Sequence, residues 1–156
     1  MSAPVSASPG KKLLKWAYLL VLFLLVFTGF GQMPIFKRYY LADIPGLGWT
    51  ADFYTTHMIH YLGASFFLGL IAYALADFLL SKKRGFSLTG SAYVRMVLLA
   101  GLVGTGILRV FKNLPHVTFS PDFTLFVDIS HLALTVLFLF SALLFMFMKK
   151  AWAVNR

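Results

Sequence analysis

The sequence contains no cysteine and few charged residues. The absence of cysteine from all 156 positions excludes disulfides, Fe–S clusters, zinc–thiolate sites and covalently attached c-type haem. Charged residues make up only 12% of the chain and hydrophobic residues 60%, which is far from the average for soluble globular proteins. The composition therefore indicates a membrane protein, and any metal that it binds must be held by His, Met or carboxylate side chains.

The basic residues do not form a surface that fits nucleic acid. The net charge is +9, but Lys and Arg occur in short clusters at the ends of apolar runs and not as one stripe. Clusters in that position are typical of membrane topology signals. We therefore expect membrane lipid as a partner and no nucleic acid.

Four apolar runs predict transmembrane helices over about 14–31, 53–80, 92–111 and 123–148. Each is long enough to cross a hydrocarbon core of about 30 Å at about 1.5 Å per residue. Their short links predict an all-α, integral membrane, antiparallel four-helix bundle that forms a single domain over residues 11–150. Residues 1–10 are small and polar and predict a disordered tail, and residues 151–156 form a second tail.

The first apolar run has one alternative interpretation. A basic flank before an apolar core is also typical of a signal peptide. No small-residue cleavage site follows the run, so a retained first helix is favoured.

The distribution of Lys and Arg predicts the orientation. The side that carries both termini and the 81–91 link has ten of them, against four on the other side. By the positive-inside rule both termini are cytoplasmic, which fits a multi-pass protein of the bacterial inner membrane. The loops 32–52 and 112–122 are then expected on the outer, periplasmic side.

The two halves of the sequence resemble each other. Three matches carry the resemblance: Thr28-Gly29 with Thr105-Gly106, Asp52-Phe53 with Asp122-Phe123, and His60 with His131. The offsets are 77, 70 and 71 residues, so the first outer loop is simply longer. Both halves run in the same direction through the membrane, which predicts a parallel internal repeat of two helix pairs about an axis near the membrane normal.

The repeat places one histidine on the second helix of each pair at a similar depth. An ionisable side chain within a membrane segment is costly and indicates a functional site. We therefore expect His60 and His131 to ligate one haem iron, with the small pairs Thr28-Gly29 and Thr105-Gly106 allowing close approach to the macrocycle. The alternatives are helix packing for each Thr-Gly pair and an interhelical hydrogen bond for each histidine.

His57 lies one turn from His60, so either could be the ligand. The repeat selects His60 and sets His57 opposite Asp128, which predicts a polar lid, a contact to a propionate or quinone, or a proton shuttle. Arg109 is the first candidate to neutralise a haem propionate, and Lys112 is the second. The alternative for Arg109 is that of a helix-end residue whose side chain reaches water.

Helices three and four carry a family resemblance. The segments Leu102-Val103-Gly104-Thr105-Gly106, Asp128-Ile129-Ser130-His131-Leu132-Ala133 and Phe147-Met148-Lys149-Lys150-Ala151-Trp152 resemble the last two helices of the cytochrome b (gamma) subunit of respiratory formate dehydrogenases. That family and its relatives in nickel-iron hydrogenases are quinone-linked b-type cytochromes with four or five helices. Their outer haem is ligated from helices two and four, which His60 and His131 match. The inner pair is missing, because helix one has no His and Phe145 stands fourteen residues beyond His131.

The resemblance implies a mono-haem variant, an electron-transfer subunit of an oxidoreductase complex and not a catalyst alone. It would pass electrons between menaquinone or ubiquinone and a periplasmic partner with Fe–S clusters or c-type haems, beside other membrane subunits. The partner is expected on the loops 32–52 and 112–122. Candidates for quinone protons are His57, Asp128 and Asp77, whereas His116 is expected to be a solvated loop residue. The alternative is a haem-free membrane anchor, or a small transporter subunit with a His/Asp proton or metal site.

Overall fold

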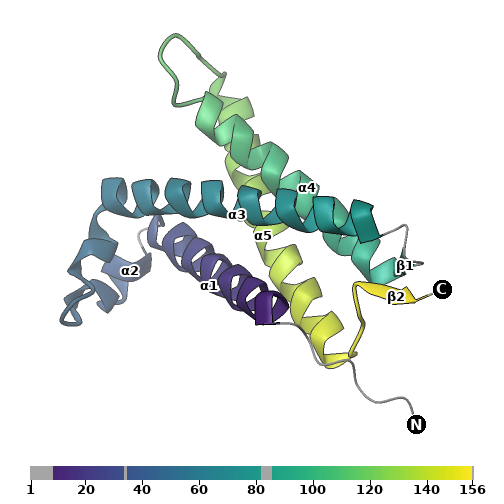
Figure 1. The fold of residues 1–156 in the computed structure, drawn as a ribbon. Helices are drawn as coiled ribbons and strands as arrows, with labels where there is room; N and C mark the ends of the chain where they lie inside the picture. The colour runs from purple at the N-terminus through teal and green to yellow at the C-terminus, as the bar shows by residue number, and fades with distance from the viewer. Residues whose placement is uncertain (1–8, 34, 82–85, 156) are drawn as a thin grey trace. The chain divides into compact units, whose positions relative to one another are not determined.

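The computed structural model describes residues 9–33, 35–81 and 86–155, and it is dominated by four long helices (Figure 1). These are α1 (Pro9–Gly31), α3 (Phe53–Ser81), α4 (Gly90–Phe111) and α5 (Pro121–Phe147). Each contains an apolar segment of 20 or more residues, long enough to cross a membrane. The predicted all-α membrane fold with four spanning helices is confirmed.

The helix boundaries lie close to the predicted ones. Local capping explains the early starts of α4 and α5: the side chain of Thr89 accepts a hydrogen bond from the backbone N–H of Ala92, and Ser120 accepts one from Phe123. Pro121 stands in the first turn of α5, where its missing N–H costs nothing. Helix α1 begins at Pro9, so it includes two residues assigned to the N-terminal tail; residues 1–8 of that tail lie outside the described residues.

The chain divides into two compact units, with the boundary between Leu80 and Ser81. In the first unit α1 and α3 run antiparallel. A Cβ added at Gly63 would lie 3.2 Å from the Leu25 side chain, and the rings of Tyr18 and Phe67 lie 5.6 Å apart. Contacts therefore join the middle of α1 to the middle of α3, and Gly63 leaves room for the Leu25 side chain between them.

The segment between α1 and α3 is held by aromatic side chains. It contains the short helix α2 (Ile35–Arg38) and the 3-10 turns η1 (Leu41–Asp43) and η2 (Gly48–Ala51). The ring of Phe27, near the end of α1, lies 5.0 Å from that of Phe36 and 6.0 Å from that of Trp49. These contacts fold the loop back onto the end of the helix pair. Pro34 lies outside the described residues.

In the second unit α4 and α5 form an antiparallel hairpin (Figure 1). Gly101 of α4 faces Leu134 of α5, where an added Cβ would lie 3.1 Å from the leucine side chain. The connection between the helices contains His116 with φ 68°, a left-handed conformation that His adopts more readily than most residues. His116 is exposed, which agrees with the expected loop position.

The sequence did not predict a two-stranded ladder next to this hairpin. β1 (Phe86–Leu88) pairs antiparallel with β2 (Ala153–Asn155), with Ser87 opposite Val154. The hydroxyl of Thr89 also donates to the backbone carbonyl of Ala151 at 2.7 Å. The segment 151–155 therefore packs against the start of α4, whereas Arg156 and the basic residues Lys82, Lys83 and Arg84 lie outside the described residues.

Arg95 adds a second attachment for the C-terminal segment. It is 6% exposed, and its guanidinium carbon lies 4.9 Å from the ring centroids of both Phe145 and Trp152. Its Nη2 donates to the backbone carbonyl of Lys150 at 3.2 Å. Two cation–π contacts and one hydrogen bond thus join α4 to the end of α5 and the residues that follow it.

Candidate functional site

In the first unit the site begins with Thr28 and His60, which face each other across α1 and α3. Thr28 is fully buried, and its hydroxyl oxygen lies 3.0 Å from Nδ1 of His60. The same hydroxyl donates to the backbone carbonyl of Leu24, one turn earlier in α1, at 2.7 Å. By donating to a carbonyl of its own helix, a threonine in an apolar helix satisfies the hydrogen-bonding requirement of its hydroxyl group.

These two distances favour one tautomer of His60. A threonine hydroxyl has one hydrogen, and where the helix carbonyl accepts it, the oxygen acts as the acceptor toward the imidazole. This arrangement assigns the proton to Nδ1 of His60. In a neutral imidazole the other nitrogen, Nε2, is then the unprotonated one, and it is the atom that can ligate a metal.

The second unit repeats this arrangement. The hydroxyl oxygen of Thr105 lies 2.9 Å from Nδ1 of His131 and donates to the carbonyl of Gly101 at 2.8 Å. The donor and acceptor assignment is therefore the same, and Nε2 of His131 is again the unprotonated nitrogen. The Thr-Gly and His elements of the predicted repeat thus form the same contact in both units.

The glycines beside the two threonines face the imidazoles. A Cβ added at Gly29 would lie 3.3 Å from Cε1 of His60, and one at Gly106 would lie 3.5 Å from Cε1 of His131. From the sequence, these Thr-Gly pairs were expected to allow close approach of a macrocycle. In the structure the space beside each glycine receives the edge of the histidine ring.

His57 has different surroundings from His60. Its ring lies edge-on to those of Phe53, at 5.1 Å, and Tyr61, at 4.3 Å. The Thr-Gly pair of α1 contacts His60, three residues farther along the helix. The two histidines therefore have different neighbours, and the choice of His60 over His57 as a ligand stays a prediction.

Arg109, Lys112 and Asp128 form an ion cluster on the α4–α5 hairpin. Nε of Arg109 lies 2.9 Å from Oδ1 of Asp128, and Nζ of Lys112 lies 2.7 Å from Oδ2. The sequence repeat predicted Asp128 opposite His57 and did not predict this cluster. The sequence positions could have indicated this cluster, because Arg109 and Lys112 lie at the end of one arm of a short hairpin and Asp128 lies near the start of the other.

Asp77, the remaining proton candidate, is exposed near the end of α3. Within the described ranges, no group of three or more His, Cys, Asp or Glu side chains could hold a metal ion. A metal coordinated by a cluster of protein ligands is therefore not among the arrangements seen in these residues. The two repeated histidines instead each contact the hydroxyl of a threonine on the neighbouring helix.

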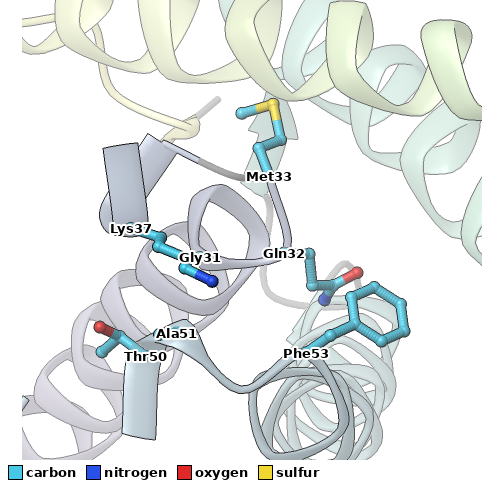
Figure 2. A pocket seen from close by; sticks show the side chains of 7 residues that line it. All are labelled: Gly31, Gln32, Met33, Lys37, Thr50, Ala51 and Phe53. Atoms are coloured by element: carbon cyan, nitrogen blue, oxygen red, sulfur yellow. The ribbon is translucent and has the colours of Figure 1, made fainter. Parts of the chain in front are cut away.

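A cavity of about 200 Å³ lies at the loop end of the first unit (Figure 2). It is lined by residues from the end of α1, α2, η2 and the start of α3, among them Gln32, Lys37 and Thr50. Nε2 of Gln32 is buried and has no hydrogen-bond partner within the part of the chain that the structure describes. The cavity wall contains neither His57 nor His60 among the described residues, so this space is separate from the Thr28–His60 contact.

Comparison of the chain with protein-family models, with curated proteins and with solved structures found no match.

Proposed function

We propose that this protein is a membrane-anchoring b-type cytochrome subunit that binds one haem b, with His60 and His131 as axial ligands. The observation that carries the proposal is the repeated Thr–His contact, at 3.0 Å in one unit and 2.9 Å in the other. Each contact favours the tautomer in which Nε2 of a histidine in an apolar helix would be the nitrogen that ligates a metal. Axial ligation of iron by two imidazoles requires one such nitrogen from each histidine.

The other residues of the two units fit the same cofactor. The chain has no cysteine, so a non-covalent b-type haem suits it better than a c-type haem. The ion cluster has two positive charges against one negative charge and therefore keeps a net charge of +1, which suits a haem propionate. Haem supplies one-electron chemistry, and the chain supplies the two imidazoles, the apolar surroundings and these cations.

The proposal includes a location and partners. The excess of Lys and Arg at the termini and in the 81–91 link supports cytoplasmic termini in a bacterial inner membrane. Electrons would pass between menaquinone or ubiquinone and a periplasmic subunit that carries Fe–S clusters or c-type haems. That subunit would dock on the loops 32–52 and 112–122, beside other membrane subunits of the complex. His57, Asp128 and Asp77 remain the candidates for the quinone protons.

The test is the haem content of the purified full-length protein, measured as the pyridine haemochrome. We expect one b-type haem per chain. His60→Ala and His131→Ala should each abolish six-coordinate haem, whereas the matched variants His57→Ala and His116→Ala should retain it. A protein without haem would contradict the proposal and favour a haem-free anchor or a transporter subunit. Haem that survives both His60→Ala and His131→Ala would contradict the ligand assignment.

A further inference from the structure

We infer that Thr28 and Thr105 are positioning residues that fix the ligating tautomer of the two histidines and increase the electron donation of each imidazole to its metal. This inference rests on the proposed function for the identity of the metal group. The tautomer itself depends only on contacts within each helix pair. The two parts can therefore be tested separately.

The helix backbone fixes the direction of the hydrogen bond between each threonine and its histidine. In each unit the threonine hydroxyl donates to a carbonyl one turn back in its own helix, Leu24 for Thr28 and Gly101 for Thr105. A water molecule or a freely rotating hydroxyl could donate to Nδ1 or accept from it, and would allow either tautomer. A threonine whose hydrogen is taken by the helix backbone can only accept. The helix therefore determines which imidazole nitrogen is protonated.

The glycine beside each threonine gives the imidazole ring its place against the helix. Gly29 and Gly106 leave room for Cε1 of each imidazole beside the helix backbone, with an added Cβ only 3.3 and 3.5 Å away. The ring is thus held at Nδ1 by a hydrogen bond, and its Cε1 occupies the space that the glycine leaves beside the helix. A partner of this kind, which fixes the orientation and basicity of a metal-bound histidine, generally contributes about 10- to 100-fold in metal affinity or activity.

The hydrogen bond at Nδ1 also affects the electron density at Nε2. A hydrogen bond from Nδ1–H to an acceptor draws the proton away from the ring and makes Nε2 a stronger electron donor. A stronger donor favours the oxidised metal, so each threonine should lower the midpoint potential of the haem. Because the two threonines act on different ligands, their effects should add.

The main experiment compares Thr28→Val, Thr105→Val and the double variant with the wild-type full-length protein. We expect each single change to raise the midpoint potential and to weaken haem binding by about 10- to 100-fold, with the shifts adding in the double variant. Thr28→Ser and Thr105→Ser retain the hydroxyl and should restore the wild-type values. Thr56→Val and Thr135→Val are matched controls, because among the described residues the Thr56 hydroxyl bonds to the backbone carbonyl of Asp52 and the Thr135 hydroxyl to the backbone carbonyl of His131, not to its ring.

A second measurement does not require haem. The ¹⁵N chemical shifts of the His60 and His131 rings in the haem-free protein should report the Nδ1–H tautomer, and each Thr→Val change should alter the tautomer of its own histidine only. Potentials and affinities equal to those of the Thr56 and Thr135 controls would overturn the role in electron donation. A mixed tautomer in the wild-type protein would overturn the positioning role, whatever the haem content. A wild-type protein that binds no haem but shows the Nδ1–H tautomer would overturn only the proposed function.

Discussion

Nζ of Lys112 lies 2.7 Å from Oδ2 of Asp128, across the turn that joins α4 to α5. Arg109 contacts the other carboxylate oxygen at 2.9 Å. One carboxylate thus joins two cations from the end of α4 to the second turn of α5. The side chains are 19–37% exposed, so solvent weakens these ion pairs relative to buried ones.

Asp128→Asn should lower the stability of the α4–α5 hairpin by up to about 1 kcal/mol, the usual range for partly exposed ion pairs. The reason is that Arg109 and Lys112 lose their common counter-charge and repel each other. The measurement is unfolding by a denaturing detergent at low and at high salt. High salt should reduce the difference in stability between Asp128→Asn and the wild type. Asp43→Asn, at an exposed carboxylate of η1, is the matched charge control, and equal losses in the two variants would contradict the prediction.

Gly29→Ala should be more destabilising than Gly106→Ala. A Cβ at 3.3 Å from Cε1 of His60 forces the ring to move, whereas 3.5 Å at His131 is an ordinary contact. Overpacking costs about 1–3 kcal/mol, and replacing glycine in a helix returns about 1 kcal/mol. We therefore expect a net loss at Gly29 and a gain of up to about 1 kcal/mol at Gly106. Gly104→Ala, where a Cβ would meet nothing within 4 Å, is the control for helix propensity alone, and denaturing-detergent midpoints of the three variants provide the ranking.

The start of α3 should become less ordered at low pH through Asp52. The Thr55 hydroxyl and the backbone N–H groups of Tyr54 and Thr55 donate to its carboxylate and lower the pKa of Asp52 from its ordinary value of 3.8. Because the pKa is lower in the folded protein, the stabilisation is present above pH 3.8 and is lost as the pH falls through the folded value.

Amide exchange of Tyr54 and Thr55 against pH measures this effect. Asp52→Asn should keep part of the protection at neutral pH and lose its pH dependence, since an amide caps a helix without titrating. Asp52→Ala should lose the protection at every pH. Equal pH profiles for Asp52→Asn and the wild type would refute the assignment to Asp52.

Arg95→Ala should release the C-terminal segment from α4. The change removes the cation from between Phe145 and Trp152, and two cation–π contacts of about 0.5–1 kcal/mol each correspond to roughly a tenfold increase in the open population. Hydrogen exchange of the Val154 amide measures the opening. Arg95→Lys keeps the charge but loses the flat guanidinium, so it should give an intermediate result. Lys149→Ala controls for loss of a nearby positive charge, and an equal effect there would argue against the ring contacts.

The sequence predicted the long helices well because membrane thickness sets their length. Helix α3 begins at the predicted Phe53 and ends one residue after the predicted Leu80, and α1 and α4 end at the predicted Gly31 and Phe111. The two-stranded ladder was missed for a physical reason. β1 and β2 have three residues each, too few for an alternating pattern, and their pairing depends on where the α4–α5 hairpin brings its two ends.

The candidate site was predicted in part. The spacing of Thr28 with His60 and of Thr105 with His131 predicted a repeat, but the direction of each hydrogen bond depends on side-chain rotamers and on the helix carbonyl at the preceding turn. Offsets along a sequence carry no such information. The same limit applies to Asp128, whose alignment with His57 did not reveal the closer cations at the end of α4.

The ladder between β1 and β2 also has a consequence for the order of folding during synthesis. Its first strand leaves the ribosome before α4, but its partner, residues 153–155, leaves only after α5. The helices α1 and α3, with the Thr28–His60 contact, are complete before translation reaches either strand. Since chains fold from the N-terminus as they are synthesised, the second unit closes only after residues 153–155 have been made. Emergence of the segment that follows α5, and not emergence of α5 itself, is therefore the event that allows the ladder to pair.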